Sequence, residues 1–157
     1  MPGGCSPLSV TVSDEEVAAL VRRITEAAQA LIAGDIEGYV ARIKHAHDYT
    51  LMSPYGGEPV RGFDESDEAL EALARFFRGG EAQVEVVETY AAGPLAVLVV
   101  VERQRGTVGD LPEQDWPLRV TWVFRRTAAD WEVVHRHADA LVHAIDHERL
   151  GALARGE

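Results

Sequence analysis

The sequence predicts an α+β fold in a single domain. Apolar residues recur at helical spacing in the first half of the chain, whereas extended segments separated by turn signals fill the second half. Helices that precede a run of antiparallel strands are typical of α+β proteins. A chain of 157 residues can bury one sizeable core. Its sequence contains no repeat and no linker that would indicate a second domain.

Three helices are predicted before the main sheet. The first follows the capping box at residues 13–16 (Ser-Asp-Glu-Glu), after which apolar residues form one stripe. Gly34-Asp35 ends this stripe, and a second, shorter helix begins at Ile36. A strand over residues 47–52 and a turn at Ser53-Pro-Tyr-Gly-Gly57 come next. The third helix is expected over residues 65–78, with Gly79-Gly80 as its stop signal.

The remaining chain is predicted to form two hairpins and a tail. Residues 84–90 and 95–105 flank the turn at Ala92-Gly-Pro94, and residues 116–126 and 131–138 flank residues 128–130. The expected organisation is an N-terminal extension (1–12), one domain (13–139) and a tail (140–157) that forms a loose helix.

Composition excludes several classes of partner. Acidic residues outnumber Lys and Arg by 26 to 15, so the formal net charge is −11. Such a charge disfavours binding to nucleic acid and to an anionic membrane surface. Cys5 is the only cysteine, so no internal disulfide can form. The first ten residues do not resemble a secretion signal, and the apolar run at 95–101 is too short to span a bilayer, which together predict a cytoplasmic protein.

Three stretches together carry a family resemblance. They are Ala33-Gly-Asp-Ile-Glu-Gly38, then Met52-Ser-Pro-Tyr-Gly-Gly57 with Arg61-Gly62, and finally Arg119-Val-Thr-Trp-Val-Phe-Arg-Arg126 with Trp131-Glu-Val-Val-His-Arg-His137. Their order and spacing over residues 14–139 resemble the nuclear transport factor 2-like superfamily, also called the SnoaL-like fold. The last stretch is similar to the closing hairpin of small SnoaL-like proteins and of the calcium/calmodulin-dependent kinase association domain.

The resemblance implies a cone-shaped, cystatin-like roll. In that fold a curved antiparallel sheet wraps around three N-terminal helices and leaves an apolar pocket, and members often form homodimers through the outer sheet face. The implied function is binding of an apolar or acidic small molecule, with cofactor-free isomerase, cyclase or dehydratase activity on a polyketide-like substrate as an extension. A non-catalytic ligand-binding or assembly module is the first alternative, because fold alone does not fix the chemistry.

The catalytic residues of one branch of the superfamily, the ketosteroid isomerases, have no counterpart in this sequence. The resemblance places Ser53 where those enzymes have a catalytic Asp, Ala27 near the position of their oxyanion-binding Tyr, and Thr121 near that of their second acid. A serine without an adjacent base removes a carbon-bound proton poorly at neutral pH. Isomerisation by that mechanism is therefore disfavoured.

The last predicted strand decides where the site lies. Successive side chains of a strand point to opposite faces, so Arg136 lies on one face, with His135 and His137 on the other. The register of related folds predicts that Arg136 faces the pocket together with Glu132, Val134 and Ala138, and that Trp131, Val133, His135 and His137 face outward. A β-bulge would reverse this assignment locally.

The other strands complete the predicted site. The same register turns His47, Tyr49, Ser53, Glu102 and Thr121 inward, together with Leu51, Leu98, Val100, Arg119 and Val123. Arg136 is expected to anchor a carboxylate or enolate oxygen, and Glu102 to pair with it or accept a proton. His47 and Tyr49 are expected to donate or relay a proton. An internal ion pair and core packing are the respective structural alternatives. The predicted binding residues are Tyr39, Ser53, Phe76, Phe77, Trp116, Arg119 and Thr121.

Histidine pairs raise a second alternative, a metal-dependent hydrolase. All six histidines occur in close pairs, His45 with His47, His135 with His137, and His143 with His147. Each spacing places two rings on one face, as a metal site requires. No acidic residue lies at a recognisable ligand spacing to supply a third ligand. We therefore expect neither a metal nor another cofactor.

Overall fold

A computed structural model describes residues 11–157 of the chain, so Cys5 and most of the predicted N-terminal extension lie outside it. The helices are α1 (Asp14–Ile32), α2 (Ile36–Arg42), α3 (Asp67–Phe76) and α4 (His147–Ala154). The strands are β1 (His45–Met52), β2 (Val60–Arg61), β3 (Phe77–Ala92), β4 (Leu95–Val108), β5 (Gln114–Asp115), β6 (Leu118–Arg126) and β7 (Trp131–Ala140). This arrangement confirms the predicted α+β class.

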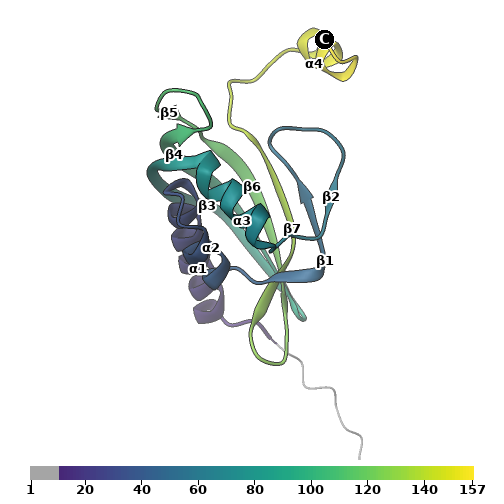
Figure 1. Cartoon of the computed structure of the whole chain (residues 1–157). Coiled ribbons are helices and arrows are strands. Elements are labelled where there is room, and N and C mark those ends of the chain that lie inside the picture. The colour runs from purple at the N-terminus through teal and green to yellow at the C-terminus, as the bar shows by residue number, and fades with distance from the viewer. Residues whose placement is uncertain (1–10) are drawn as a thin grey trace, which may run out of the picture.

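The strands form one curved sheet, and α1 packs against it over β3 and β4 (Figure 1). The order is β2-β1-β7-β6-β4-β3, with β5 pairing with β4. The pair β1–β7 is parallel, whereas the other strand pairs are antiparallel. The sheet is therefore mixed, and the predicted antiparallel pairing holds for every strand pair except β1–β7. The two parallel strands are far apart in sequence, so no hairpin fixes their relative direction.

The first two helices follow from local signals. Ser13 caps α1 by accepting a hydrogen bond from the Glu16 backbone at 3.1 Å, as the capping box predicted. Asp35 caps α2 through the Gly38 amide at 3.0 Å. Gly34 between them has a φ of +80°, and a Cβ there would lie 2.4 Å from a backbone oxygen of β3. Glycine therefore allows the two helices to join close to the sheet.

The third helix is shorter than predicted. It ends at Phe76, and β3 begins at the next residue, so Gly79 and Gly80 lie in the strand instead of stopping the helix. Gly80 lies opposite Gly106 of β4. A Cβ on Gly80 would lie 2.3 Å from the backbone oxygen of Arg105 and 2.9 Å from the Ile32 side chain. The absence of a Cβ at Gly80 and Gly106 therefore allows β3, β4 and α1 to pack closely at this point.

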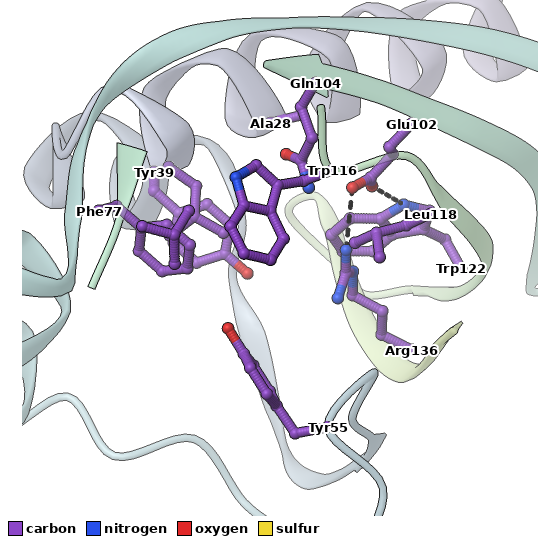
Figure 2. A pocket seen from close by; sticks show the side chains of 12 residues that line it. Ala28, Tyr39, Tyr55, Phe77, Glu102, Gln104, Trp116, Leu118, Trp122 and Arg136 are labelled. Carbon is purple, nitrogen blue, oxygen red and sulfur yellow. Dashed lines mark hydrogen bonds and ion pairs between the residues drawn. The ribbon is translucent and has the colours of Figure 1, made fainter. Parts of the chain in front are cut away.

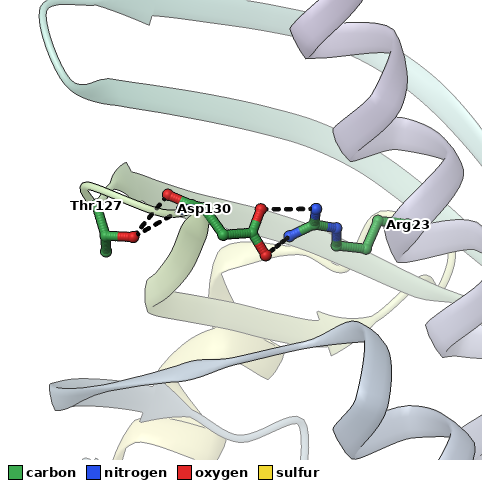
Figure 3. A network of polar contacts seen from close by, with 3 residues as sticks. All are labelled: Arg23, Thr127 and Asp130. Atoms are coloured by element: carbon green, nitrogen blue, oxygen red, sulfur yellow. Dashed lines mark hydrogen bonds and ion pairs between the residues drawn. The ribbon is translucent and has the colours of Figure 1, made fainter.

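A polar network joins α1 to the turn between β6 and β7 (Figure 3). Two nitrogens of Arg23 donate to Asp130 at 2.9 and 3.2 Å. Thr127 Oγ1 donates to the Asp130 backbone oxygen at 2.8 Å and accepts from its amide at 3.0 Å. A two-point arginine–carboxylate contact fixes orientation as well as distance. The network therefore anchors the closing hairpin to the first helix.

The C-terminal segment lies apart from this body. An extended connection leaves β7 and leads to α4, which stands away from the sheet in Figure 1 and has no buried residue. The predicted helix in the tail is thus present over His147–Ala154. Among residues 11–157, no helix is long and apolar enough to cross a membrane.

Candidate functional site

A cavity of about 100 Å³ lies between α1, α2 and the strands β4, β6 and β7, with the β1–β2 connection beside it. Side chains from both helical and sheet elements surround it (Figure 2). Most are apolar or aromatic, and the polar groups are few, as is usual for small-molecule sites. The lining consists of Ala28, Leu31, Tyr39, Tyr55, Phe77, Glu102, Gln104, Val108, Trp116, Leu118, Trp122 and Arg136.

The charged centre of the cavity is an ion pair between β7 and β4. Arg136 Nη2 donates to Glu102 Oε2 at 3.0 Å, and the Glu102 side chain is only 3% exposed. Trp122 Nε1 donates to the other carboxylate oxygen at 3.3 Å. The Arg136 guanidinium lies over the Trp122 ring, 4.9 Å from its centroid. The pair combines charge, hydrogen bonding and a cation–π contact in one buried place.

Arg136 retains donor capacity beyond this pair. Among residues 11–157, the bond to Glu102 is the guanidinium's only hydrogen bond, and the buried Nε has no partner. Figure 2 shows one guanidinium nitrogen turned to Glu102 and another towards the open space. Glu102, by contrast, accepts one hydrogen bond at each oxygen. The arginine is therefore the better placed of the two to contact a ligand.

A second polar group lies beside the cavity, on α2 and β1. Tyr39 lines the cavity, and its hydroxyl oxygen lies 3.4 Å from Nε2 of His45. The His45 ring stacks on Phe63 at 3.8 Å and meets Tyr49 edge-on at 4.7 Å. Burial, followed by the nearby Arg136 charge, lowers the His45 pKa to about 4. Burial also raises the pKa of Tyr39 and of Tyr49, so all three groups are neutral at pH 7.

His45 occupies the place that we predicted for His47. The pairing of β1 with β7 shifts between His45 and Thr50, where five steps on β1 match only two steps on β7. This irregularity breaks the alternation on which the prediction rested. His47 is exposed, so its predicted inward orientation is wrong. Tyr49 is buried as predicted, but it lies behind His45 and does not line the cavity.

The orientation of β7 matches the prediction around Arg136 and differs before it. Arg136 lies opposite Trp122, and Ala138 is buried, so both face the interior. Val123 pairs with His135 and Phe124 with Val133, which leaves Val134 as the extra residue of a bulge. The bulge reverses the faces of the β7 residues that precede it in the sequence.

Trp131 and Val133 are therefore core residues, contrary to prediction. Glu132 lies between these two core residues, so the prediction that it points inward is also wrong, whereas Val134 is the unpaired residue of the bulge. His135 lies on the outer side, where its Nδ1 is 2.8 Å from Thr50 Oγ1, and His137 is exposed as predicted.

The predicted faces of β6 are wrong by one residue. Trp122 lies opposite both Leu98 of β4 and Arg136 of β7, and directly opposed residues share a face of the sheet. Val120, Trp122 and Phe124 are accordingly buried. Arg119, Thr121 and Val123 then lie on the outer face, and Arg119 pairs there with Asp139 at 2.7 Å. A one-residue error in register moves every side chain of a strand to the opposite face.

The other predicted binding residues divide between the cavity and its surroundings. Phe77, Trp116 and Tyr39 line the cavity, and Trp116 is held by a hydrogen bond from Nε1 to the Gly106 backbone at 3.0 Å. Phe76 lies near Tyr55, at 6.3 Å between ring centroids, without lining the cavity. Ser53 Oγ accepts from the Tyr55 amide at 3.2 Å, so it shapes the turn and is not in the lining.

Several lining residues were not predicted. Gln104 continues the inward alternation of Leu98, Val100 and Glu102, so the same pattern could have identified it. Tyr55 lies within the turn at residues 53–57, and nothing in the sequence around it indicated that it lines a cavity. Trp122 could be identified only from its cross-strand partners. The other lining residues that the sequence did not indicate are Ala28, Leu31, Val108 and Leu118.

The histidine pairs do not assemble a metal site in the part of the chain that the structure describes. Within residues 11–157, no group of three His, Cys, Asp or Glu side chains is arranged to hold a metal ion. The rings of His135 and His137 are 6.5 Å apart, and His135 contacts Thr50 instead. Structural zinc sites need four ligands and catalytic ones at least three. The geometry therefore gives the metal-hydrolase alternative no support.

Comparisons with known proteins agree with this architecture. The family described as a SnoaL-like domain matches residues 20–142. A candidate scytalone dehydratase from Novosphingobium aromaticivorans superposes with a TM-score of 0.66, at 14% identity over 84% of this chain and 90% of the other. No curated protein matches the sequence.

Two further solved structures share the fold. A nuclear transport factor 2-like protein of unknown function from Pseudomonas putida gives a TM-score of 0.60, at 24% identity over 88% of this chain and 93% of the other. The CaMKII hub of S. rosetta gives 0.60, at 17% identity over 78% and 95%. These likenesses extend to the fold alone.

Proposed function

Because this chain belongs to the SnoaL-like domain family, we propose that it binds an apolar or acidic small molecule in the cavity around Arg136. The observation that carries the proposal is a buried guanidinium that keeps free donors beside an aromatic cavity. A guanidinium with an unused donor suits a carboxylate or enolate oxygen. The aromatic lining supplies contact area for a flat apolar body.

The cavity volume limits the part of the ligand that can enter. About 100 Å³ is well below the 300–1,000 Å³ of typical ligand sites. An engineered cavity of about 150 Å³ in another protein accepts a benzene ring. We therefore infer that the cavity takes roughly one ring of a ligand, with the rest of a larger, polyketide-like molecule outside the mouth. Tyr55, which is 72% exposed, stands at this mouth.

Beyond ligand binding, the proposal extends to catalysis by proton transfer. Isomerisation, cyclisation and dehydration all develop negative charge on a substrate oxygen, which Arg136 could stabilise. Two neighbours support the extension: the candidate scytalone dehydratase and a candidate dehydratase from Streptomyces avermitilis, each described by that activity. Glu102 is a weak choice of base, because both oxygens already accept hydrogen bonds and one faces a cation. Ligand binding is therefore the primary proposal.

A thermal-shift screen with one-ring aromatic acids such as benzoate and salicylate tests the proposal. A ligand present at 100 times its Kd stabilises the folded state by about 2.7 kcal/mol, which for a chain of this size is roughly 5–10 °C in Tm. Wild type and Arg119→Met, which alters an arginine of the outer face, should both respond. Glu102→Gln/Arg136→Met, which removes both charges, should not respond. Equal shifts in all three proteins would remove Arg136 from the site.

Self-association is a second candidate function, supported by the outer sheet face. This face carries a groove of about 450 Å³ lined by Val87, Val99, Val100, Val101, Arg119, Val120, Thr121, His137 and Asp139. Two structural neighbours are described as a hub and as an association domain. An apolar stripe bordered by charged pairs fits an isologous contact between two copies. We therefore propose a homodimer through this face, compatible with ligand binding on the opposite one.

A further inference from the structure

His45 is a half-buried histidine whose Nδ1 is fully buried, and ligand binding as proposed above assigns it no role. Its ring is held from two sides, by stacking on Phe63 with an interplanar angle of 11° and by the edge-on contact with Tyr49. Nε2 then points to the Tyr39 hydroxyl at 3.4 Å. This distance lies at the long end of the range for a hydrogen bond. The ring orientation is therefore fixed by packing and directed at a residue of the cavity wall.

The two nitrogens of His45 have different surroundings. Nδ1 is buried and has no hydrogen-bond partner among the described residues, whereas Nε2 has Tyr39. A neutral imidazole carries its proton on one nitrogen only. A proton on Nδ1 would leave a buried N–H without an acceptor, and such orphan donors are rarer than unused lone pairs. The surroundings therefore favour the tautomer that is protonated at Nε2.

The direction of this hydrogen bond decides what Tyr39 offers to the cavity. If Nε2–H donates to the Tyr39 oxygen, the hydroxyl proton is free to point elsewhere. Figure 2 shows the oxygens of Tyr39 and Tyr55 facing the same open space as the free side of Arg136. In the opposite tautomer Tyr39 would donate to His45 and would present only lone pairs to that space. With the proton on Nε2 of His45, Tyr39 offers a donor and favours a ligand that accepts a hydrogen bond. With the proton on Nδ1, Tyr39 offers only lone pairs and favours a ligand that donates one.

We propose that His45 is a positioning residue that donates from Nε2 to Tyr39 and thereby turns the Tyr39 hydroxyl proton into the cavity. Tyr39 and Arg136 then form two donors beside one another, so the site selects a one-ring ligand with an accepting oxygen, such as an aryl ketone or a carboxylate. An aromatic alcohol that needs an acceptor would be disfavoured. The ligand class in this inference rests on the proposed binding function, whereas the His45 tautomer does not depend on it.

Nitrogen-15 NMR of histidine-labelled wild type tests the tautomer without any ligand. Long-range proton–nitrogen spectra distinguish a protonated ring nitrogen from a bare one, and His45→Gln identifies the signals. We expect Nε2 protonated and Nδ1 bare between pH 5.5 and about 8, because burial disfavours the charged ring. His47, exposed two residues along the chain, is the matched control and should show averaging between tautomers. A proton on Nδ1 of His45 would overturn the proposal.

Binding of acetophenone, measured by calorimetry, tests the consequence for the ligand. Loss of one hydrogen bond weakens binding by roughly 2–12-fold, so Tyr39→Phe should lie in this range. His45→Phe keeps the stacked ring but removes the donor, and should weaken acetophenone about 2–5-fold, whereas His45→Gln retains an N–H and should recover part of the loss. Ethylbenzene, which has the same size without the oxygen, should bind all variants alike.

The double variant Tyr39→Phe/His45→Phe separates positioning from packing. If His45 acts only through Tyr39, the double variant should bind acetophenone no more weakly than Tyr39→Phe. Additive losses, or an equal loss for ethylbenzene, would show that His45 only packs the wall and would overturn the positioning role. If wild type binds neither acetophenone nor benzoate, the proposed function fails, while the NMR spectrum still decides the tautomer.

Discussion

Glu102 of β4 and Arg136 of β7 form an ion pair on the inner face of the sheet, with 3.0 Å between Oε2 and Nη2, although β6 lies between the two strands. The curvature of the sheet lets the long arginine side chain reach across β6, over the ring of Trp122. Trp122 also donates to Glu102, so one aromatic residue supports both members of the pair. The pair thus holds the strands and presents the cation to the cavity.

Removing one member of this pair should cost more than removing both. Arg136→Met leaves Glu102 buried without its cation, and breaking buried pairs typically costs about 3–5 kcal/mol. Glu102→Gln/Arg136→Met leaves no uncompensated charge and should be markedly more stable than Arg136→Met. Urea denaturation of the single and double variants measures the coupling. Arg155→Met, in the exposed pair with Glu157 at the end of the chain, is the control and should change little. Equal stability of single and double variants would contradict a tightly coupled pair.

His45 should make the protein less stable in mild acid. Its pKa is about 4 in the folded protein against 6.5 as the ordinary value, so the unfolded chain binds a proton that the folded one does not. Stability from this group is complete above pH 6.5, falls as the pH drops to about 4, and changes no further below it. The loss across that window is up to about 3 kcal/mol.

Unfolding free energies of wild type and His45→Phe between pH 4 and 7.5 check this expectation. His45→Phe should show a flatter dependence on pH, because phenylalanine has no group that can be protonated. His47→Phe alters an exposed ring of the same strand and should keep the wild-type slope. Parallel curves for wild type and His45→Phe would contradict the burial of a neutral imidazole.

Gly106→Ala should destabilise the fold at the contact between β3, β4 and α1. A Cβ at this position would lie 2.4 Å from the Gly79 backbone oxygen and 3.0 Å from Ile32. The backbone atoms cannot move without disturbing strand pairing, so we expect a loss of about 1–3 kcal/mol or more. Gly151→Ala in α4, where the nearest atom is a flexible side chain at 3.5 Å, is the control. A Gly106→Ala protein as stable as wild type in thermal denaturation would refute this close contact.

A charge at the centre of the outer face should dissociate the proposed dimer. Val99 lies opposite Thr121 in this face, and Val99→Glu would place two like charges near the symmetry axis. Sedimentation should show wild type as a dimer and Val99→Glu as a monomer. Val60→Glu, an equivalent change on the exposed strand β2, should remain dimeric. A monomeric wild type would remove the dimer from the proposed functions.

The sequence predicted the elements better than their faces. The capping box at Ser13, the break at Gly34 and both hairpins are local signals, and the structure contains each of them. The stop signal at Gly79-Gly80 was wrong because both residues lie in β3, where Gly80 is in close contact with Gly106 and Ile32, which are distant in sequence. Glycine pairs have the same sequence signature in both roles, so only the packing distinguishes them.

The site shows the same division. The alternation of side chains correctly predicted that Glu102 and Arg136 face the cavity. This prediction succeeded because β4 pairs regularly with β6, and β7 does so after its bulge. The same rule failed for His47 and Thr121. For His47 the strand is irregular between His45 and Thr50, and for Thr121 the assumed register was off by one residue.

The sequence alone therefore determined the fold class, the order of the main helices and strands (the two-residue strands β2 and β5 excepted), and the residues that share a face within any uninterrupted run of strand. These properties follow from capping, periodicity and alternation, which act over a few neighbouring residues. Only the tertiary structure decided which histidine lies behind Tyr39, that Trp122 supports the ion pair, and that Arg119 and Thr121 face outward. Bulges and register are set by pairing between strands far apart in the chain, and a local pattern carries no information about that pairing.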